Sequence, residues 1–154
     1  PPSACLGGSV ITSQPPFHLA IPVDDLAAAR TFYSERLGCT EGRCSDRWID
    51  FNWYGHQVVA HLVEPVEARV TRRTPVDGEA IPVPHFGLVL PMQEWRRVIA
   101  RLEAAGQVWV VPPAVRFAGQ AGEQATAFLA DPAGNVIELK AMAEPGNLFA
   151  REPR

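Results

Sequence analysis

Residues 122–140, GEQATAFLADPAGNVIELK, are the most informative stretch of the sequence. QATAFLA at 124–130 is a short run of apolar and strand-forming residues, which predicts a β-strand. The turn signal DPAGN at 131–135 follows, and VIELKA at 136–141 predicts the next strand. This last strand carries a carboxylate, Glu138, among apolar residues. The stretch therefore predicts a hairpin with a charged side chain in an otherwise apolar strand.

The rest of the chain repeats one pattern twice. PFHLAIPV at 16–23 and VPHFGLVL at 83–90 each predict a strand, and each precedes a helical stripe that ends at a glycine. RWIDFNWY at 47–54 alternates apolar and polar residues and predicts a hairpin with QVVAHLV at 57–63. Matching residues of the two halves lie 67 to 69 positions apart: His18 and His85, Pro22 and Pro91, Gly38 and Gly106. Each half is therefore predicted to be a βαβββ module.

The repeat predicts an α+β fold in which two tandem βαβββ modules form a curved mixed sheet around a cleft. Module 1 is expected at about 16–64 and module 2 at about 83–142. A linker at 65–82 is rich in proline and shows no steady periodicity. Residues 1–15 are expected to be an N-terminal arm and residues 143–154 a tail. The 154 residues suit one domain.

Composition excludes several classes of protein. The chain is 47% hydrophobic and 20% charged, which is typical of a globular protein. A net charge of −3 offers no broad basic surface for nucleic acid. No apolar run approaches the roughly 20 residues that span a bilayer, and no signal peptide is evident, so a cytoplasmic location is expected. The three cysteines, Cys5, Cys39 and Cys44, are an odd number and are expected to be reduced.

Four residues with related places in the repeat are candidate metal ligands. His18 and His85 lie in the first strand of each half, and His61 and Glu138 lie in the last. If the halves pack as a pseudo-symmetric pair, these side chains converge on one cleft. Two imidazoles and a carboxylate bind Fe(II), Mn(II), Zn(II) or Ni(II) and leave coordination positions open. The remaining positive charge favours a bidentate anionic ligand, such as a catecholate or an enediolate.

Each candidate has a second interpretation. A single histidine in a strand is more often a packing residue than a ligand, and Glu138 could lie exposed beside Lys140 on a solvated face. Joint placement in the repeat favours ligation by His18, His85 and Glu138. Three interpretations of His61 stay open: a fourth metal ligand, a catalytic acid or base beside the metal, or a packing residue.

PPAVRFAGQAGEQ at 112–124 is predicted to be a long loop after a strand at 108–111, VWVV. Long loops often carry function. Arg116 is a candidate for binding a substrate anion through its forked donors, and a surface salt bridge is the alternative. Gln124, at the end of the loop, is the second candidate for substrate binding.

These motifs resemble the vicinal oxygen chelate superfamily, also called the glyoxalase, bleomycin resistance protein and extradiol dioxygenase superfamily. FHLAIPVDDLAAARTFYSERLG is similar to its first strand and helix, YGHQVVAHL to the closing hairpin of its first module, and VPHFGLVL to the start of its second. The DPAGN turn followed by the strand with Glu138 is the most specific feature. The resemblance covers about residues 16 to 142.

The resemblance implies two βαβββ modules around a metal cleft, with His18, His85 and Glu138 at metal-ligand positions. His61 matches the remaining position, which ligates the metal in glyoxalase-type and epimerase-type members but not in extradiol dioxygenases. Short members commonly form homodimers whose sites lie between modules or between subunits. A homodimer is therefore expected.

Three functions are compatible with the resemblance. The favoured one is an extradiol-type dioxygenase, in which Fe(II) or Mn(II) binds a small substrate with vicinal oxygens and His61 is a nearby acid or base. The second is a glyoxalase-like lyase or isomerase, in which Zn(II) or Ni(II) held by all four residues stabilises an enediolate. The third, of another class, is a small-molecule binding or resistance protein. Because the metal-free members have lost the ligands and this chain keeps them, an enzyme is expected.

Overall fold

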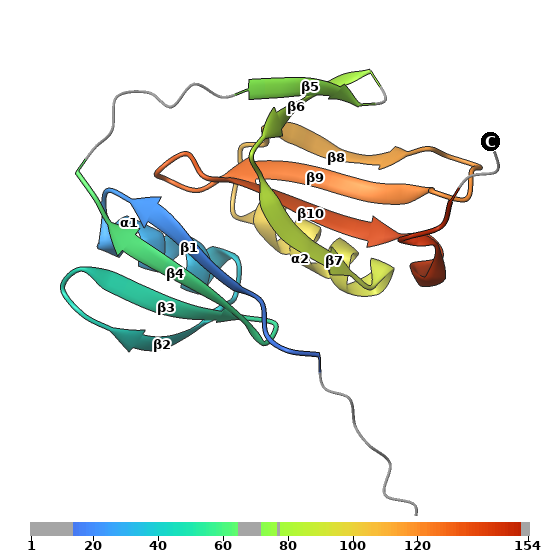
Figure 1. The fold of residues 1–154 in the computed structure, drawn as a ribbon. Coiled ribbons are helices and arrows are strands. Elements are labelled where there is room, and N and C mark those ends of the chain that lie inside the picture. The colour runs from blue at the N-terminus through green and yellow to red at the C-terminus, as the bar shows by residue number, and fades with distance from the viewer. Residues whose placement is uncertain (1–13, 65–71, 77, 152–154) are drawn as a thin grey trace, which may run out of the picture.

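Module 1 is a four-stranded sheet with a helix behind it (Figure 1). The computed structural model describes residues 14–64, 72–76 and 78–151. The strands are β1 (His18–Val23), β2 (Thr40–Cys44), β3 (Trp48–Trp53) and β4 (His56–Leu62), in the order β1-β4-β3-β2. Helix α1 (Leu26–Arg30) continues into a π-helical segment, η1 (Thr31–Arg36). The Asp25 carboxylate accepts a hydrogen bond from the Ala28 N–H and caps the helix start.

Module 2 repeats the arrangement. Its strands are β7 (Phe86–Leu90), β8 (Val111–Arg116), β9 (Gln124–Ala130) and β10 (Val136–Met142), in the order β7-β10-β9-β8. Helix α2 (Met92–Ala104) follows the first strand, and a short 3-10 helix, η2 (Pro145–Asn147), follows the last. In both modules the first strand pairs in parallel with the last strand. The prediction of two βαβββ modules is confirmed, although the strands form two hydrogen-bonded sheets, not one continuous sheet.

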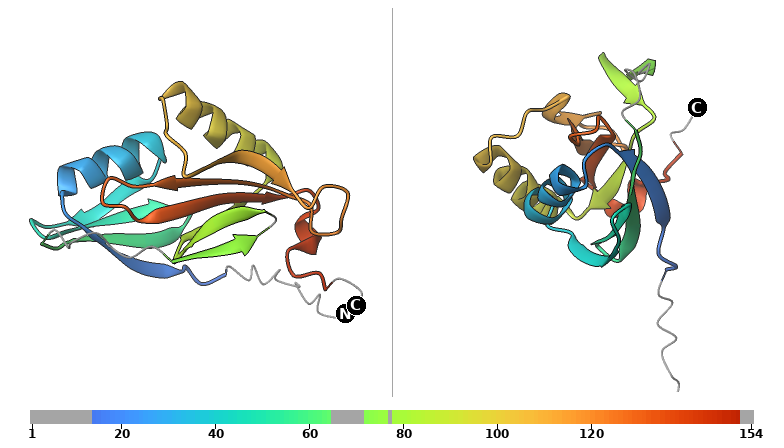
Figure 2. Two further views of the ribbon diagram at one scale, coloured as in Figure 1. Left: turned by 90° about the horizontal axis from the view of Figure 1, so that it is seen from above. Right: turned by 90° about the vertical axis from the view of Figure 1, so that its left-hand side faces the viewer.

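One core serves both modules. Figure 2 shows that the two helices lie on the same side of the two sheets. Alternate strand residues face the helices, and a single buried cluster contains Phe51 and Leu139 from the two sheets together with Leu102 of α2. We call the other side of each sheet, away from the helices, its open face. His18 and His61 lie on the open face of module 1.

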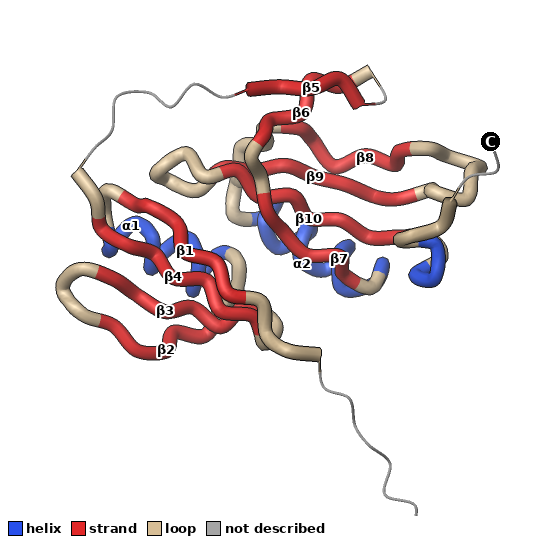
Figure 3. The backbone as a smooth tube through the Cα atoms, in the orientation of Figure 1, coloured by secondary structure: helices blue, strands red, loops and turns tan. Residues whose placement is uncertain are grey.

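The expected linker contains a two-stranded hairpin, β5 (Arg72–Val76) and β6 (Glu79–Val83) (Figure 3). Residues 65–71 and 77 of the linker lie outside the described residues. The predicted linker at 65–82 shows no steady periodicity, but its described residues form most of this hairpin, because an isolated hairpin tolerates the two prolines, Pro75 and Pro82, that weakened the strand signal. Ile81 of β6 packs against Val111 and Phe128, so the hairpin covers part of the open face of module 2.

Strand β8 begins later than predicted and runs through much of the expected loop. Pro112 and Pro113 lie in this edge strand, beside a register shift between Val111 and Ala114. An edge strand tolerates proline because one side of it makes no ladder hydrogen bonds. Arg116 is therefore the last residue of a strand and does not belong to a loop.

The cysteines that the structure describes are free, as predicted: Cys39 is buried and Cys44 is exposed, whereas Cys5 lies outside the described residues. Burial raises the pKa of the Cys39 thiol to about 12. Within the described ranges, no helix combines the length and the apolar character needed to cross a bilayer.

Candidate functional site

His85 and Glu138 form the pair at the centre of the candidate site. His85 precedes β7 by one residue, and Glu138 lies in β10, which pairs in parallel with β7. The Nε2 atom of His85 is 3.1 Å from Oε2 of Glu138. Their side chains are 26% and 13% exposed, so the pair is partly shielded from solvent. Of the two predicted positions of Glu138, the structure favours the candidate site over a fully solvated face.

Local sequence explains why the two strands bring these side chains together. Gly87 is opposite Glu138 in the ladder, and a Cβ atom at Gly87 would collide with the backbone carbonyl of Glu138. On the other side of the sheet, the indole Nε1 of Trp95 donates to the Leu139 carbonyl at 2.8 Å. Glycine therefore permits the close approach of β7, and α2 holds β10 in place.

The ring of His85 is fixed by two further contacts. Its Nδ1 lies 2.7 Å from the Pro82 carbonyl, and its ring packs edge-on against Phe128 with 5.0 Å between centroids. The hydrogen bond with the Glu138 carboxylate raises the pKa of His85 above its usual value, while burial opposes this shift. With Nδ1–H donating to the Pro82 carbonyl, a protonated Nε2 donates to Glu138, and a deprotonated Nε2 is available to a metal.

Lys140 is the third charged residue of this group, and it was not among the predicted site residues. Its Nζ is 3.7 Å from Oε1 of Glu138. The period of two in a strand already places residues 138 and 140 on one face. That signal was present in the sequence but was interpreted only as an alternative for Glu138.

His18 lies on the open face of module 1, apart from the pair in module 2. It is exposed, and its Nδ1 is 2.7 Å from Oε1 of Gln57, its partner in the ladder. Throughout the described part of the chain, no three His, Cys, Asp or Glu side chains are grouped closely enough to hold a metal ion. The structure thus brings His85 and Glu138 together and leaves His18 separate.

His61 does not occupy the position that corresponds to Glu138. His18 pairs with Gln57, and the ladder of module 2 places residue 136 opposite His85. Two residues further along each last strand, Val59 corresponds to Glu138, and two residues beyond these His61 corresponds to Lys140. The ladder partner of His18 is Gln57, and His61 is four residues further along β4, about 13 Å at the usual strand rise. His61 is exposed on the same open face as His18. Its place in the repeat therefore does not support ligation beside His18.

Arg116 and Gln124 are paired in the β8–β9 ladder on the open face of module 2. Arg116 is only 5% exposed. Its Nε donates to Oγ1 of Thr126 at 3.0 Å, its Nη1 donates to the Val76 carbonyl at 2.9 Å, and its buried Nη2 has no hydrogen-bond partner among the described residues. The alternative of a surface salt bridge is wrong for Arg116, because no ion pair joins it to a carboxylate of the described residues.

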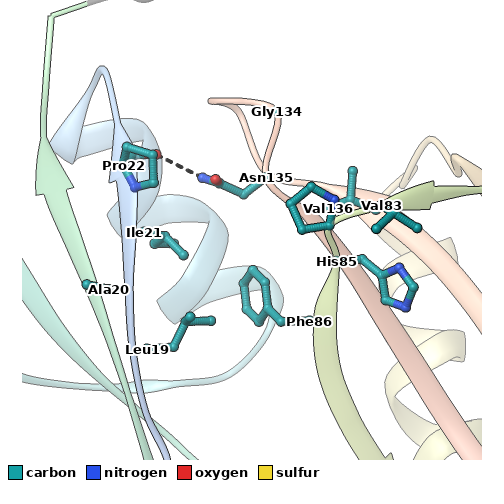
Figure 4. A pocket seen from close by; sticks show the side chains of 11 residues that line it. Leu19, Ala20, Ile21, Pro22, Val83, His85, Phe86, Gly134, Asn135 and Val136 are labelled. Atoms are coloured by element: carbon teal, nitrogen blue, oxygen red, sulfur yellow. Dashed lines mark hydrogen bonds between the residues drawn. The ribbon is translucent and has the colours of Figure 1, made fainter. Parts of the chain in front are cut away.

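The DPAGN turn joins the two modules. The buried Asp131 carboxylate accepts hydrogen bonds from the Tyr33 hydroxyl at 2.9 Å and from the backbone N–H groups of Ala133 and Asn135. The Asn135 side-chain amide donates to the Pro22 carbonyl at 2.9 Å (Figure 4). Burial and the Asp131 carboxylate raise the pKa of Tyr33. The turn that distinguishes the sequence thus ties β10 to module 1.

A pocket of about 270 Å³ lies beside this junction, between β1 and the start of β7 (Figure 4). Its walls are mostly apolar, and they include Leu19 and Ile21 from β1 and Phe86 from β7. His85 also lines it. The candidate site therefore borders an apolar space at the boundary between the modules.

The chain belongs to a large enzyme and resistance-protein superfamily. The family model described as "Glyoxalase/Bleomycin resistance protein/Dioxygenase superfamily" matches residues 16–139. This confirms the family that the motifs resemble. A comparison with curated proteins found no match.

Solved structures with the same fold cover most of the chain. A glyoxalase/bleomycin resistance protein/dioxygenase from Alicyclobacillus acidocaldarius is 28% identical, with a TM-score of 0.73 over 87% of this chain and 96% of that chain. The fosfomycin resistance protein FosX from Listeria monocytogenes, complexed with Mn(II) and sulfate, is 17% identical, with a TM-score of 0.64 over 90% of this chain and 97% of that one. A virulence protein from Salmonella typhimurium is 21% identical, with a TM-score of 0.58 over 85% and 98%.

Proposed function

We propose that the protein is a divalent-metal-dependent enzyme that acts on a small substrate with vicinal oxygens, and that its reaction is an extradiol-type dioxygenation. The ligands would be His85 and Glu138 of one protomer and His18 of a second copy. The observation that carries the proposal is the 3.1 Å contact between Nε2 of His85 and Oε2 of Glu138 on the open face of module 2.

The donor atoms of these residues fit a divalent ion. In both histidines Nδ1 faces an oxygen acceptor, the Gln57 amide for His18 and the Pro82 carbonyl for His85, so Nε2 is available as the ligand atom. Glu138 supplies a carboxylate beside one of them. A bound dication would act as a Lewis acid toward the substrate oxygens.

A second copy of the chain would complete the ligand set. His18 is exposed on the open face of module 1, whereas the pair lies in module 2, and the described residues of one chain offer no third ligand beside that pair. Short members of the superfamily commonly form homodimers, with sites between modules or between subunits. If the open face of module 1 lay against the open face of module 2 of a second copy in a homodimer, His18 would lie near the partner's His85.

The register of β4 favours three ligands over four. Val59 has no donor atom at the position that corresponds to Glu138, so the four-ligand lyase or isomerase site with Zn(II) or Ni(II) would need a different residue there. Two histidines and one carboxylate with open positions are typical of Fe(II) oxygenases. His61, on the open face with His18, would serve as a proton donor or acceptor through a ring nitrogen.

Metal analysis tests the ligand set. Protein purified without chelators should hold about one metal ion per chain, whereas His18→Ala, His85→Ala and Glu138→Ala should each lose most of it. Glu103→Ala removes an exposed carboxylate of α2 and should leave metal content unchanged. Retention of metal by all three ligand variants with intact folds would overturn the assignment.

Mixed dimers test whether the site is shared between subunits. Co-expression of a His18→Ala chain with a Glu138→Ala chain should restore one intact site per mixed dimer, about half of the wild-type metal content. Each variant alone should restore none. A ligand set within one chain would give no restoration in the mixture.

Assays of turnover then test the reaction. Fe(II)-loaded protein should cleave a catechol ring under O2, and His61→Ala should reduce turnover without loss of metal. Activity only with Zn(II) or Ni(II), on a substrate that forms an enediolate, would instead support the glyoxalase-like reaction. Metal-free binding without turnover would support a binding or resistance protein.

A further inference from the structure

Lys140 has an unusual place in this chain. It is the only lysine among the 154 residues, and the other 13 of the 14 basic side chains are arginines. It lies on the open face of module 2, with its Nζ 3.7 Å from Oε1 of Glu138. The one lysine is thus in contact with a proposed metal ligand.

Lys140 also lines a pocket of about 220 Å³ on the side of Glu138 away from the module boundary. Gln124 and Met142, which are paired on the same open face, also line it, together with Phe117, Asn147 and Leu148. Because Lys140 both lines this pocket and contacts Glu138, the pocket adjoins the proposed metal position. A ligand in it could reach both groups.

A second, buried cation lies next to this pocket. Arg116 is paired with Gln124 and precedes Phe117, and both neighbours line the pocket. Its guanidinium contacts Thr126, the ladder partner of Lys140, so one strand separates the two cations. Among the residues that the structure describes, Nη2 of Arg116 has no hydrogen-bond partner, and its guanidinium is not paired with a carboxylate. A buried, uncompensated charge is costly, and a bound anion would offset that cost.

The charges on the open face of module 2 would favour the binding of an anion when a metal ion is bound to Glu138. Among the strand residues that the register places there within the described chain, Lys140 and Arg116 oppose a single carboxylate, Glu138. A divalent ion on Glu138 would more than neutralise that carboxylate. A cleft with net positive charge would then form in a chain whose net charge is −3.

We propose that Lys140, backed by Arg116, binds an anionic group of the substrate in the pocket beside Glu138. The substrate class is then a small organic anion with two vicinal oxygens and a separate carboxylate, phosphonate or similar group. This inference rests on the proposed function for the metal-bound oxygens, whereas the anion site itself stands on contacts within module 2.

Two matched probes test the substrate class. Catechol and 3,4-dihydroxybenzoate share the vicinal oxygens and differ in one carboxylate. Calorimetry on anaerobic, metal-loaded protein should give about tenfold tighter binding of the carboxylate probe, the factor expected of one favourable ion pair in a cleft. Lys140→Gln should abolish this preference, so that the two probes bind with similar affinity. An equal preference in Lys140→Gln and wild type would overturn the proposal.

Phosphate binding to the metal-free protein separates this proposal from the metal assignment. Reductive methylation with 13C-formaldehyde labels the ε-amine of Lys140, the one lysine, and its NMR signal should shift when inorganic phosphate is added. Phosphate affinity should rise several-fold in Glu138→Gln, because a competing carboxylate is removed, and fall several-fold in Lys140→Gln by calorimetry. Arg97→Gln, which removes an exposed arginine on α2, is the control and should change nothing.

The outcomes distinguish the two proposals. The expected phosphate pattern in a protein that never retains metal supports the anion site and contradicts the proposed function. Metal retained through His85 and Glu138, with phosphate affinity equal in wild type, Glu138→Gln and Lys140→Gln, supports the function and overturns the anion site. Arg116→Gln should also weaken phosphate binding. If the loss of the buried Arg116 prevents folding, Lys140→Gln alone provides the test.

Discussion

The two modules have the same strand order and contribute to one core, but their open faces differ. At matched ladder positions, module 1 has Val59 and His61 where module 2 has Glu138 and Lys140. His18 faces a neutral amide, whereas His85 faces a carboxylate. Core positions of a repeat are constrained in both copies by packing, while the open faces are free to take different chemistry.

The largest expected effect is on the free energy of unfolding, and it tests whether both modules contribute to one core. Phe51→Ala in module 1 and Leu139→Ala in module 2 should each destabilise the protein by about 3–5 kcal/mol, because both side chains are fully buried in one core. Chemical denaturation should show one cooperative transition in each variant. Val115→Ala, at an exposed position, is the control and should cost under about 0.5 kcal/mol. Separate transitions for the two modules would contradict a shared core.

Loss of the hydrogen bond between Tyr33 of module 1 and Asp131 of module 2 should have a smaller effect on stability. Tyr33→Phe removes the hydroxyl that donates to Asp131 and should lower the free energy of unfolding by about 1–3 kcal/mol. In an Asp131→Asn background the same substitution should cost less, because the partner carboxylate is gone. Equal costs in both backgrounds, measured by urea denaturation, would show that this contact does not couple the modules.

Introducing a carboxylate into module 1 tests the difference between the open faces. Val59→Glu places a carboxylate at the position that corresponds to Glu138, so in the proposed dimer it should strengthen metal binding about tenfold or more, roughly 1.4 kcal/mol. It should also restore part of the metal lost in Glu138→Ala. His61→Glu is the matched control, two residues further along β4, and should restore nothing in a metal titration. Equal rescue by both variants would refute the register correspondence.

The smallest expected effect concerns the pH dependence of the metal-free protein. The Glu138 carboxylate raises the pKa of His85, so the pair stabilises the fold fully below the unfolded-state pKa of about 6.5. That contribution is lost as pH rises through the higher folded-state pKa. In Glu138→Gln, an NMR titration should show a lower pKa for His85 and a stability that depends less on pH in this range. An unchanged pKa would mean that the ion pair is absent in solution.

Much of the fold was predictable because strand alternation and helical stripes depend on local sequence. The apolar context of Glu138 singled out the strand that holds the candidate site. The contact between His85 and Glu138 could not be derived, since it requires the pairing of β7 with β10. Prolines also concealed the hairpin at 72–83 and most of β8.

The correspondence of His61 with Glu138 failed for a specific physical reason. The chain from His18 to its ladder partner, Gln57, is 39 residues long, whereas the same path in module 2, from His85 to residue 136, is 51 residues long. Insertions between the strands shift sequence position without changing ladder position. Only the register identifies Val59 as the counterpart of Glu138.

The shared core bears on how a duplicated chain of this kind can arise. A single βαβββ half would expose the apolar surface that it now buries against the other half. An ancestral half-length chain would therefore have required a second copy of itself in order to fold. Gene fusion would then have made that association permanent, and each half could afterwards acquire substitutions on its open face independently of the other.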